Sequence, residues 1–158
     1  MKKSAFYLSK LVIGFALICF ILFISVQDAA AQKSAMEMVK DAKKGIENLS
    51  IQQAKEEMAD PGVVLIDIRE SEELKQGKIP GAVHAPRGML EFYADSTLPY
   101  HKPEFSKNKR IVLYCATSGR SALAVQTLKA MGYTNVAHID GGFKAWKEAG
   151  LPVDQKDK

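Results

Sequence analysis

Short, fully apolar runs alternate with amphipathic segments along most of the 158-residue chain. The uncharged run at 111–114 and the run at 63–68, which holds one aspartate, are typical of strands buried on both faces of a parallel sheet. After the run at 111–114 and a short loop, the apolar positions recur with helical spacing as far as Met131. The pattern therefore predicts a strand, a tight loop and a helix over 110–131.

Turn and capping residues divide the remainder of the chain. Ser50 is a typical helix N-cap, and Asp60-Pro61-Gly62 ends the segment that follows it. The further expected elements are helices over 32–48, 52–58 and 143–149, a helical turn over 70–75, and strands within 77–86 and over 135–139. Strands that alternate with helices favour an α/β fold with a mainly parallel central sheet flanked by helices in three layers.

Charged residues and a cysteine directly follow the expected strands. Asp67 and Arg69 end the first, Arg87 follows the strand within 77–86, and Cys115 follows the run at 111–114. Because the carboxyl ends of parallel strands meet at one edge, we expect these residues on one rim. A buried Asp67 needs a partner, and Arg69 is a candidate. Asp67 then either pins its own loop or supports the loop that begins at Cys115.

Cys115 opens a loop of small and polar residues before the helix that contains Arg120. The residues between them are Ala116, Thr117, Ser118 and Gly119. The unpaired amides of a helix N-terminus and a guanidinium group both favour negative charge, so they favour a thiolate and would hold an incoming anion. The alternative is that Cys115 is a small buried apolar residue that ends a core strand.

The first 31 residues have the pattern of a secretory signal. Three lysines precede an uncharged apolar run at 11–26, and Ala29 and Ala31 suit an A-x-A cleavage site before Gln32. The alternative is an uncleaved membrane anchor, although the run is shorter than the ~20 residues of a spanning helix. In both cases we expect the domain to be exported to the periplasm or another extracytoplasmic space, anchored to the membrane only if the segment stays.

Removal of residues 1–31 changes both the charge and the cysteine count. The net charge falls from +4 to +2, which is too balanced to argue for nucleic acid binding. Cys19 lies in the signal, so Cys115 would be the only thiol left. An unpaired cysteine in an exported protein points to a reactive thiol or an intermolecular disulfide. A thiol–disulfide oxidoreductase is disfavoured because it needs a resolving cysteine.

The remaining chain divides into three parts. Residues 32–48 form an N-terminal helix or tether whose charges, Lys43 among them, we expect on a solvated face. Residues 49–153 form the domain, and 154–158 a disordered tail. We expect His84 to pack in the core rather than bind a metal, because no other ligand shows metal spacing with it.

Four motifs, in this order and spacing, resemble the rhodanese family of sulfurtransferases. They are D-I-R-E at 67–70, G-K-I-P-G-A at 77–82, C-A-T-S-G-R-S at 115–121 and D-G-G-F-K-A-W at 140–146. The resemblance spans about 49–153 and implies a single rhodanese-like domain. Lys78 stands where the family often has histidine, and Ala116 and Thr117 stand where many members have bulkier or charged residues. These loop differences leave the substrate preference open.

The resemblance implies a double-displacement reaction at Cys115. Its thiolate would attack the outer sulfur of a donor such as thiosulfate, become a persulfide, and pass the sulfur to cyanide or a thiol. Amides of 116–120 would hold the persulfide and Arg120 the sulfonate of the donor. Asp67, Arg69 and Arg87 would lie in the pocket rim. We expect no metal, no cofactor other than the covalent persulfide, and a monomer.

Two other functions compete with this one. A cysteine phosphatase or arsenate reductase also places a cysteine loop before a helix, but with five residues between cysteine and arginine, whereas Cys115 and Arg120 enclose four. The shorter loop gives a tighter ring of amides, which suits one added sulfur better than a phosphate group. The second alternative is a non-catalytic persulfide carrier or binding module.

Overall fold

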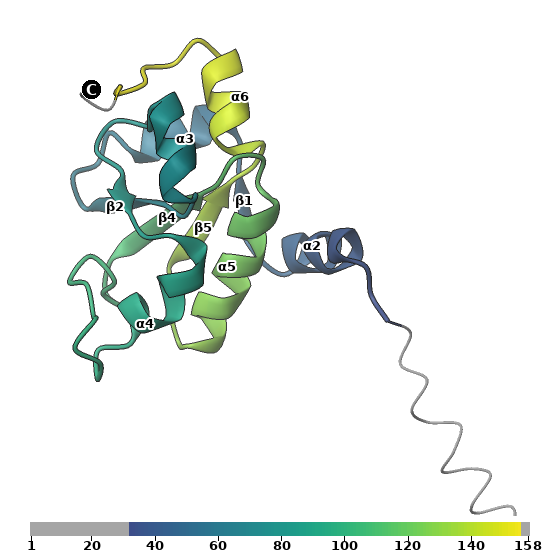
Figure 1. The fold of residues 1–158 in the computed structure, drawn as a ribbon, viewed down its shortest axis with the longest axis vertical. Coiled ribbons are helices and arrows are strands. Elements are labelled where there is room, and N and C mark those ends of the chain that lie inside the picture. The colour runs from purple at the N-terminus through teal and green to yellow at the C-terminus, as the bar shows by residue number, and fades with distance from the viewer. Residues whose placement is uncertain (1–31, 156–158) are drawn as a thin grey trace, which may run out of the picture. The chain divides into compact units, whose positions relative to one another are not determined.

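Five parallel strands form the centre of the domain (Figure 1). The computed structural model describes residues 32–155, so the expected signal or anchor over 1–31 lies outside it. The strands are β1 (Glu47–Leu49), β2 (Val63–Asp67), β3 (Val83–His84), β4 (Arg110–Tyr114) and β5 (Val136–Ile139), in the order β1-β5-β4-β2-β3. This arrangement confirms the predicted α/β fold with a parallel sheet.

Helices cover both faces of the sheet (Figure 1). They are α2 (Ala35–Lys44), α3 (Ile51–Glu57), α4 (Leu90–Ala94), α5 (Gly119–Ala130) and α6 (Gly142–Glu148), with 3-10 turns η1 (Ser71–Gln76) and η2 (Arg87–Met89). Alternate residues of β4 point to opposite faces. Ile111 and Leu113 pack with α4 and α5, while Val112 and Tyr114 pack with α3 and α6. None of the helices between residues 32 and 155 has the length and apolar character to span a membrane.

The N-terminal part of the domain differs from the prediction. The helix expected over 32–48 ends at Lys44, and residues 47–49 form β1, an edge strand beside β5. Only one of the three residues of this strand, Leu49, is buried, so the sequence shows no alternation of apolar and polar positions there. α2 packs against α5, with Ala42 buried. This helix is therefore part of the folded domain.

Two other segments are more ordered than the sequence indicated. The region 88–109, over which no helix or strand was expected, contains α4 and buries Leu90 and Phe105 in the core. Asp154, assigned to a disordered tail, exchanges two backbone hydrogen bonds of 2.9 Å with Lys78. This pairing closes the C-terminal segment over the turn that precedes β3.

Candidate active site

Cys115 lies at the carboxyl end of β4, where the chain turns sharply into α5. Only 1% of the surface of Cys115 is exposed. Ser118, the last loop residue before α5, has φ +85° and is the only described residue other than glycine in the left-handed region. Such a backbone costs about 1–3 kcal/mol and persists only where neighbouring groups hold it. The loop conformation therefore depends on contacts from outside the loop.

The N-terminus of α5 has no side-chain cap in the described structure, although a serine occupies the N-cap position. An N-cap serine normally accepts a hydrogen bond from one of the next amides. The Ser118 hydroxyl instead accepts one of 2.9 Å from Lys43 Nζ. The amides of Gly119, Arg120 and Ser121 have no acceptor within the helix, so they remain available to an anion.

Lys43 of α2 connects this loop to the turn before α6. Besides the Ser118 hydroxyl, its ammonium group binds Asp140 Oδ1 at 2.5 Å. This ion pair holds the pKa of Asp140 below its usual range. The expectation of a solvated Lys43 was therefore wrong. Because its partners lie 75 and 97 residues further along the chain, no local pattern could have identified them.

The first amides of α6 hold the loop from the opposite side. Phe143 N–H donates to the Cys115 carbonyl at 2.8 Å, and Lys144 N–H donates to the Ala116 carbonyl at 3.0 Å. In a trans peptide the N–H points opposite to the C=O, so the amides of Ala116 and Thr117 point away from α6. Gly142 makes the approach possible, since a Cβ there would lie 2.5 Å from the Cys115 carbonyl oxygen.

A buried hydrogen-bond chain supports Ser118 from beneath. Ser121 Oγ lies 3.0 Å from the Ser118 carbonyl oxygen and 3.1 Å from His138 Nδ1, and its single hydroxyl hydrogen can be donated to one of these two acceptors. His138 Nε2 in turn contacts Asn48 Oδ1 at 2.8 Å, and since an amide oxygen can only accept, Nε2 carries the proton. Burial, with a smaller contribution from Lys43, lowers the pKa of His138 to about 4. The imidazole is therefore neutral at physiological pH.

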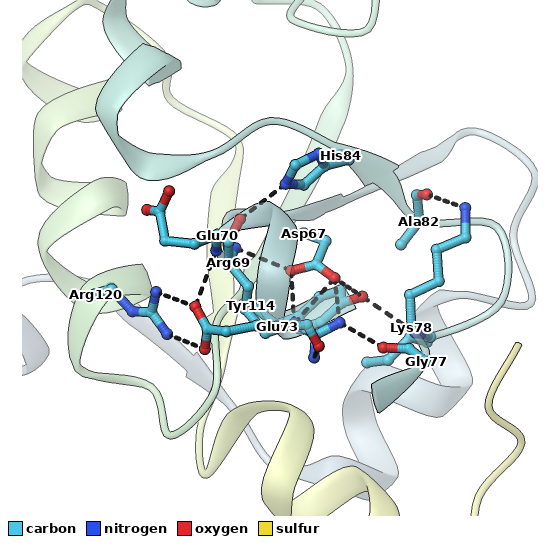
Figure 2. Close-up of polar contacts among 11 residues, drawn as sticks. Asp67, Arg69, Glu70, Glu73, Gly77, Lys78, Ala82, His84, Tyr114 and Arg120 are labelled. Carbon is cyan, nitrogen blue, oxygen red and sulfur yellow. Dashed lines mark hydrogen bonds and ion pairs between the residues drawn. The ribbon is translucent and has the colours of Figure 1, made fainter. Parts of the chain in front are cut away.

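Asp67 and Arg69 form a buried ion pair, as the sequence predicted, with Arg69 Nη2 2.6 Å from Asp67 Oδ2 (Figure 2). Tyr114 Oη donates to the same carboxylate oxygen at 2.7 Å and accepts from Ile79 N–H at 3.1 Å. Burial, more than the nearby carboxylate, raises the pKa of Tyr114. The guanidinium carbon of Arg69 lies 3.9 Å from the centre of the Phe143 ring. The pair thus links β2 to α6.

Arg120 makes a two-pronged ion pair with Glu73 of η1 (Figure 2). The two hydrogen bonds measure 2.6 and 2.7 Å. Glu73 is the main cause of a raised pKa at Arg120, and Cys115 contributes more weakly in the same direction. Arg120 in turn lowers the pKa of Glu73 to about 2. The sequence indicated Arg120 but not its partner.

A pocket of about 420 Å³ opens next to the loop. Its lining residues are Arg69, Glu73, Gln76, Ala116, Thr117, Phe143, Lys144, Lys147 and Glu148. Ala116, Thr117 and Arg69 thus face one cavity. The other predicted residues of the loop region, Cys115, Ser118, Gly119 and Arg120, do not line it.

Arg87 lies elsewhere, although its strand ends at the same rim. Its guanidinium group binds Glu91 of α4 at 2.8 Å and Thr127 of α5 at 3.2 Å. β3 is the edge strand of the sheet, and η2 carries the chain from its end toward α4. Arg87 therefore joins two helices and does not line the pocket.

His84 does not lie in the core as expected: it is half-buried on the edge strand β3, where its Nε2 donates to the Arg69 carbonyl at 2.8 Å. Among residues 32–155, no three histidine, cysteine or carboxylate side chains lie close enough together to hold a metal ion.

Known proteins resemble this chain in both sequence and fold. A sulfurtransferase of Allochromatium vinosum is 35% identical over 91 residues, which cover 58% of this chain and 78% of that protein. A putative mitochondrial thiosulfate sulfurtransferase of Schizosaccharomyces pombe is 32% identical over 102 residues, 60% of this chain and 70% of that one. The chain spans only 46% and 59% of the length of two other bacterial relatives.

A solved structure from Rhodopseudomonas palustris, described as a protein of unknown function and possible tyrosine phosphatase, is 41% identical. The two structures superpose with a TM-score of 0.73, and the match covers 81% of this chain and 99% of that one. The rhodanese-like domain family matches residues 50–149, from the start of α3 to the end of α6. Because that range contains strands β2 to β5, the Cys115 loop, α5 and α6, the chain belongs to the rhodanese-like family of sulfurtransferases.

Proposed function

We propose that the protein transfers sulfane sulfur from a small donor such as thiosulfate to a thiol or cyanide through a persulfide on Cys115. The position of Cys115 carries this proposal. It lies at the carboxyl end of β4, directly before the pocket-lining Ala116, and the amides of Gly119 and Arg120 at the N-terminus of α5 have no acceptor within the helix. Such amides stabilise an anion, and both a thiolate and a persulfide are anions.

The reaction needs two displacements. The Cys115 thiolate attacks the outer sulfur of thiosulfate, the sulfur–sulfur bond breaks, and sulfite leaves with the bonding electron pair. An acceptor then attacks the outer sulfur of the persulfide; cyanide leaves as thiocyanate and a thiolate as a new persulfide, and the Cys115 thiolate is restored. No external oxidant or reductant is required. The Arg120 guanidinium group lies in the first turn of the helix that follows Cys115, where it would attract an anionic donor.

Burial of Cys115 restricts the shape of the donor. With 1% of the residue exposed, a reactant reaches the sulfur only by presenting a narrow end. The terminal sulfur of a sulfane donor has this shape, and a phosphate group with its three terminal oxygens does not. The four-residue spacing between Cys115 and Arg120 also argues against the phosphatase suggested for the Rhodopseudomonas protein.

Intact mass and steady-state kinetics test the proposal. Incubation with thiosulfate should add one sulfur atom per chain, and cyanide should then remove it as thiocyanate. With both reagents present, thiocyanate should form over many turnovers. Cys115→Ser should fold and neither gain the sulfur nor turn over. A single labelling without turnover would identify a carrier, and hydrolysis of p-nitrophenyl phosphate without labelling would identify a phosphatase. For chain produced in an exporting host, the same spectrum reports whether it begins at Gln32, as a cleaved signal requires.

A further inference from the structure

The Glu73 carboxylate occupies the face of Arg120 that an anionic donor would use. An arginine side chain has five N–H donors, and its two terminal amino groups form the fork that best fits a carboxylate or sulfonate. Glu73 takes one hydrogen bond from each of these groups, at 2.6 and 2.7 Å. Figure 2 shows the two side chains facing each other directly. A sulfonate must therefore displace Glu73 or bind Arg120 without this fork.

The backbone around Glu73 is held firmly. Its Oε2 atom accepts a hydrogen bond of 2.9 Å from Glu70 N–H, within the capping box of η1. The buried Arg69 guanidinium donates to the Glu73 carbonyl at 3.3 Å and to the Gly77 carbonyl at 2.8 Å, at the end of the same turn. Because these hydrogen bonds from the buried Arg69 side chain to two main-chain carbonyls fix η1, Glu73 stays beside Arg120. With a pKa of about 2, the carboxylate is charged at every working pH.

Positive charge in the pocket is largely compensated near the loop. Arg69, which lines the pocket, is paired with Asp67, and Arg120 is paired with the lining residue Glu73. The remaining cations of the lining are the exposed Lys144 and Lys147 of α6. Lys144 Nζ lies 3.8 Å from Glu148 Oε1. A donor that carries two negative charges would therefore enter a site in which both guanidinium groups already have a carboxylate partner.

We propose that Glu73 is a specificity-determining residue that makes the site disfavour dianionic donors such as thiosulfate relative to donors with one negative charge or none at the transferred group. This inference rests on the proposed sulfur transfer at Cys115 and adds the substrate class. Its preferred donors are monoanionic thiosulfonates and persulfides of small thiols. Both deliver a terminal sulfur to the same thiolate.

A charge-matched pair of donors tests the proposal. Thiosulfate carries two negative charges, and methanethiosulfonate carries one; attack on its outer sulfur gives the same Cys115 persulfide and releases methanesulfinate. Glu73→Gln keeps the size of the side chain and removes its charge. We expect kcat/KM for thiosulfate to rise about tenfold in this variant, and kcat/KM for methanethiosulfonate to rise by no more than about twofold.

Glu72→Gln is the matched control. Glu72 lies on the same turn, pairs with Lys75 and is exposed, so its replacement changes the net charge of the protein equally without touching Arg120. It should leave the ratio of the two kcat/KM values unchanged. Adding Arg120→Ala to Glu73→Gln should remove the gain for thiosulfate, because the guanidinium group that the gain requires is then absent.

Different outcomes separate this inference from the proposed function. An unchanged ratio in a folded Glu73→Gln variant, or a fall in kcat/KM for thiosulfate alone, would overturn the role of Glu73. An equal change in Glu72→Gln would overturn it as well. If neither donor adds sulfur to the wild-type protein, as read from intact mass, the sulfurtransferase proposal itself fails. Should Glu73→Gln not fold, Glu73→Ala with the same two donors provides the measurement.

Discussion

Lys43 Nζ lies 2.9 Å from Ser118 Oγ and thereby keeps the N-cap hydroxyl of α5 away from the helix it precedes. Lys43→Met should release this hydroxyl, which then competes with a bound anion for the first amides of α5. We expect kcat for sulfur transfer to fall about tenfold, since small displacements of a catalytic loop have effects of this size or larger. Steady-state kinetics with thiosulfate and cyanide provide the measurement.

Two variants on the same helix control for general effects of α2. Lys40 is exposed, so Lys40→Met removes an equal charge and should keep wild-type activity. Lys43→Arg keeps a donor and should restore part of kcat. Equal activities of Lys40→Met and Lys43→Met would show that the contact with Ser118 does not affect the reaction.

Gly142 permits the close approach of α6 to the loop, and Gly142→Ala should disturb both stability and activity. The added Cβ would lie 2.5 Å from the Cys115 carbonyl oxygen, at a backbone φ of +61°. We expect a loss of about 2 kcal/mol or more in unfolding free energy and a clear fall in kcat. Gly150→Ala has a similar φ of +68° but no atom within 4 Å. It should lose about 1 kcal/mol, measured by urea unfolding, and keep full activity.

Local patterns predicted the parts of this fold that local forces determine. The apolar runs of β2 and β4, the helix N-cap at Ser50 and the strand-to-helix turn at Cys115 all appear where expected. The partnership of Asp67 and Arg69 also followed, because a buried carboxylate needs a neighbouring cation.

The contacts that define the candidate site are long-range, and no local pattern encodes them. Glu73 meets Arg120 across 47 positions, and Lys43 meets Ser118 across 75. A surface glutamate on a helical turn has the same local sequence whether or not a guanidinium group faces it. β1 was not predicted for another reason. Only one of its three side chains is buried, which is too few to show the alternation of apolar and polar positions typical of a strand.

Tyr114 satisfies two buried groups at once, so Tyr114→Phe should be destabilising without affecting the chemistry. The change removes a 2.7 Å donor from Asp67 Oδ2, which keeps its hydrogen bond from Arg69 Nη2, and leaves the Ile79 N–H without its acceptor. Buried groups left without partners cost about 1–3 kcal/mol. Thermal and urea unfolding should show this loss, and kcat should stay near the wild-type value. Tyr100→Phe, at an exposed position, should change neither; equal stabilities for both variants would contradict the argument.

His138 should make the domain less stable in mild acid. The pKa of its imidazole is about 4 in the folded protein, against about 6.5 in an unfolded chain. Below pH 6.5 the unfolded chain therefore binds a proton that the folded protein does not, so the free energy of unfolding falls as the pH drops from 6.5 to 4 and gains nothing from this group above 6.5. The difference corresponds to roughly 3 kcal/mol across that window.

The direction follows from the groups around the ring. Burial and the Lys43 ammonium oppose its protonation, Asp140 favours it more weakly, and the contacts to Ser121 and Asn48 are neutral. Urea unfolding of His138→Gln between pH 7 and 4.5 should lose most of this slope, whereas His84→Gln and His101→Gln should keep it. If His138→Gln retained the wild-type slope, carboxylates such as Asp140, whose pKa is lowered in the folded state, would be its source instead.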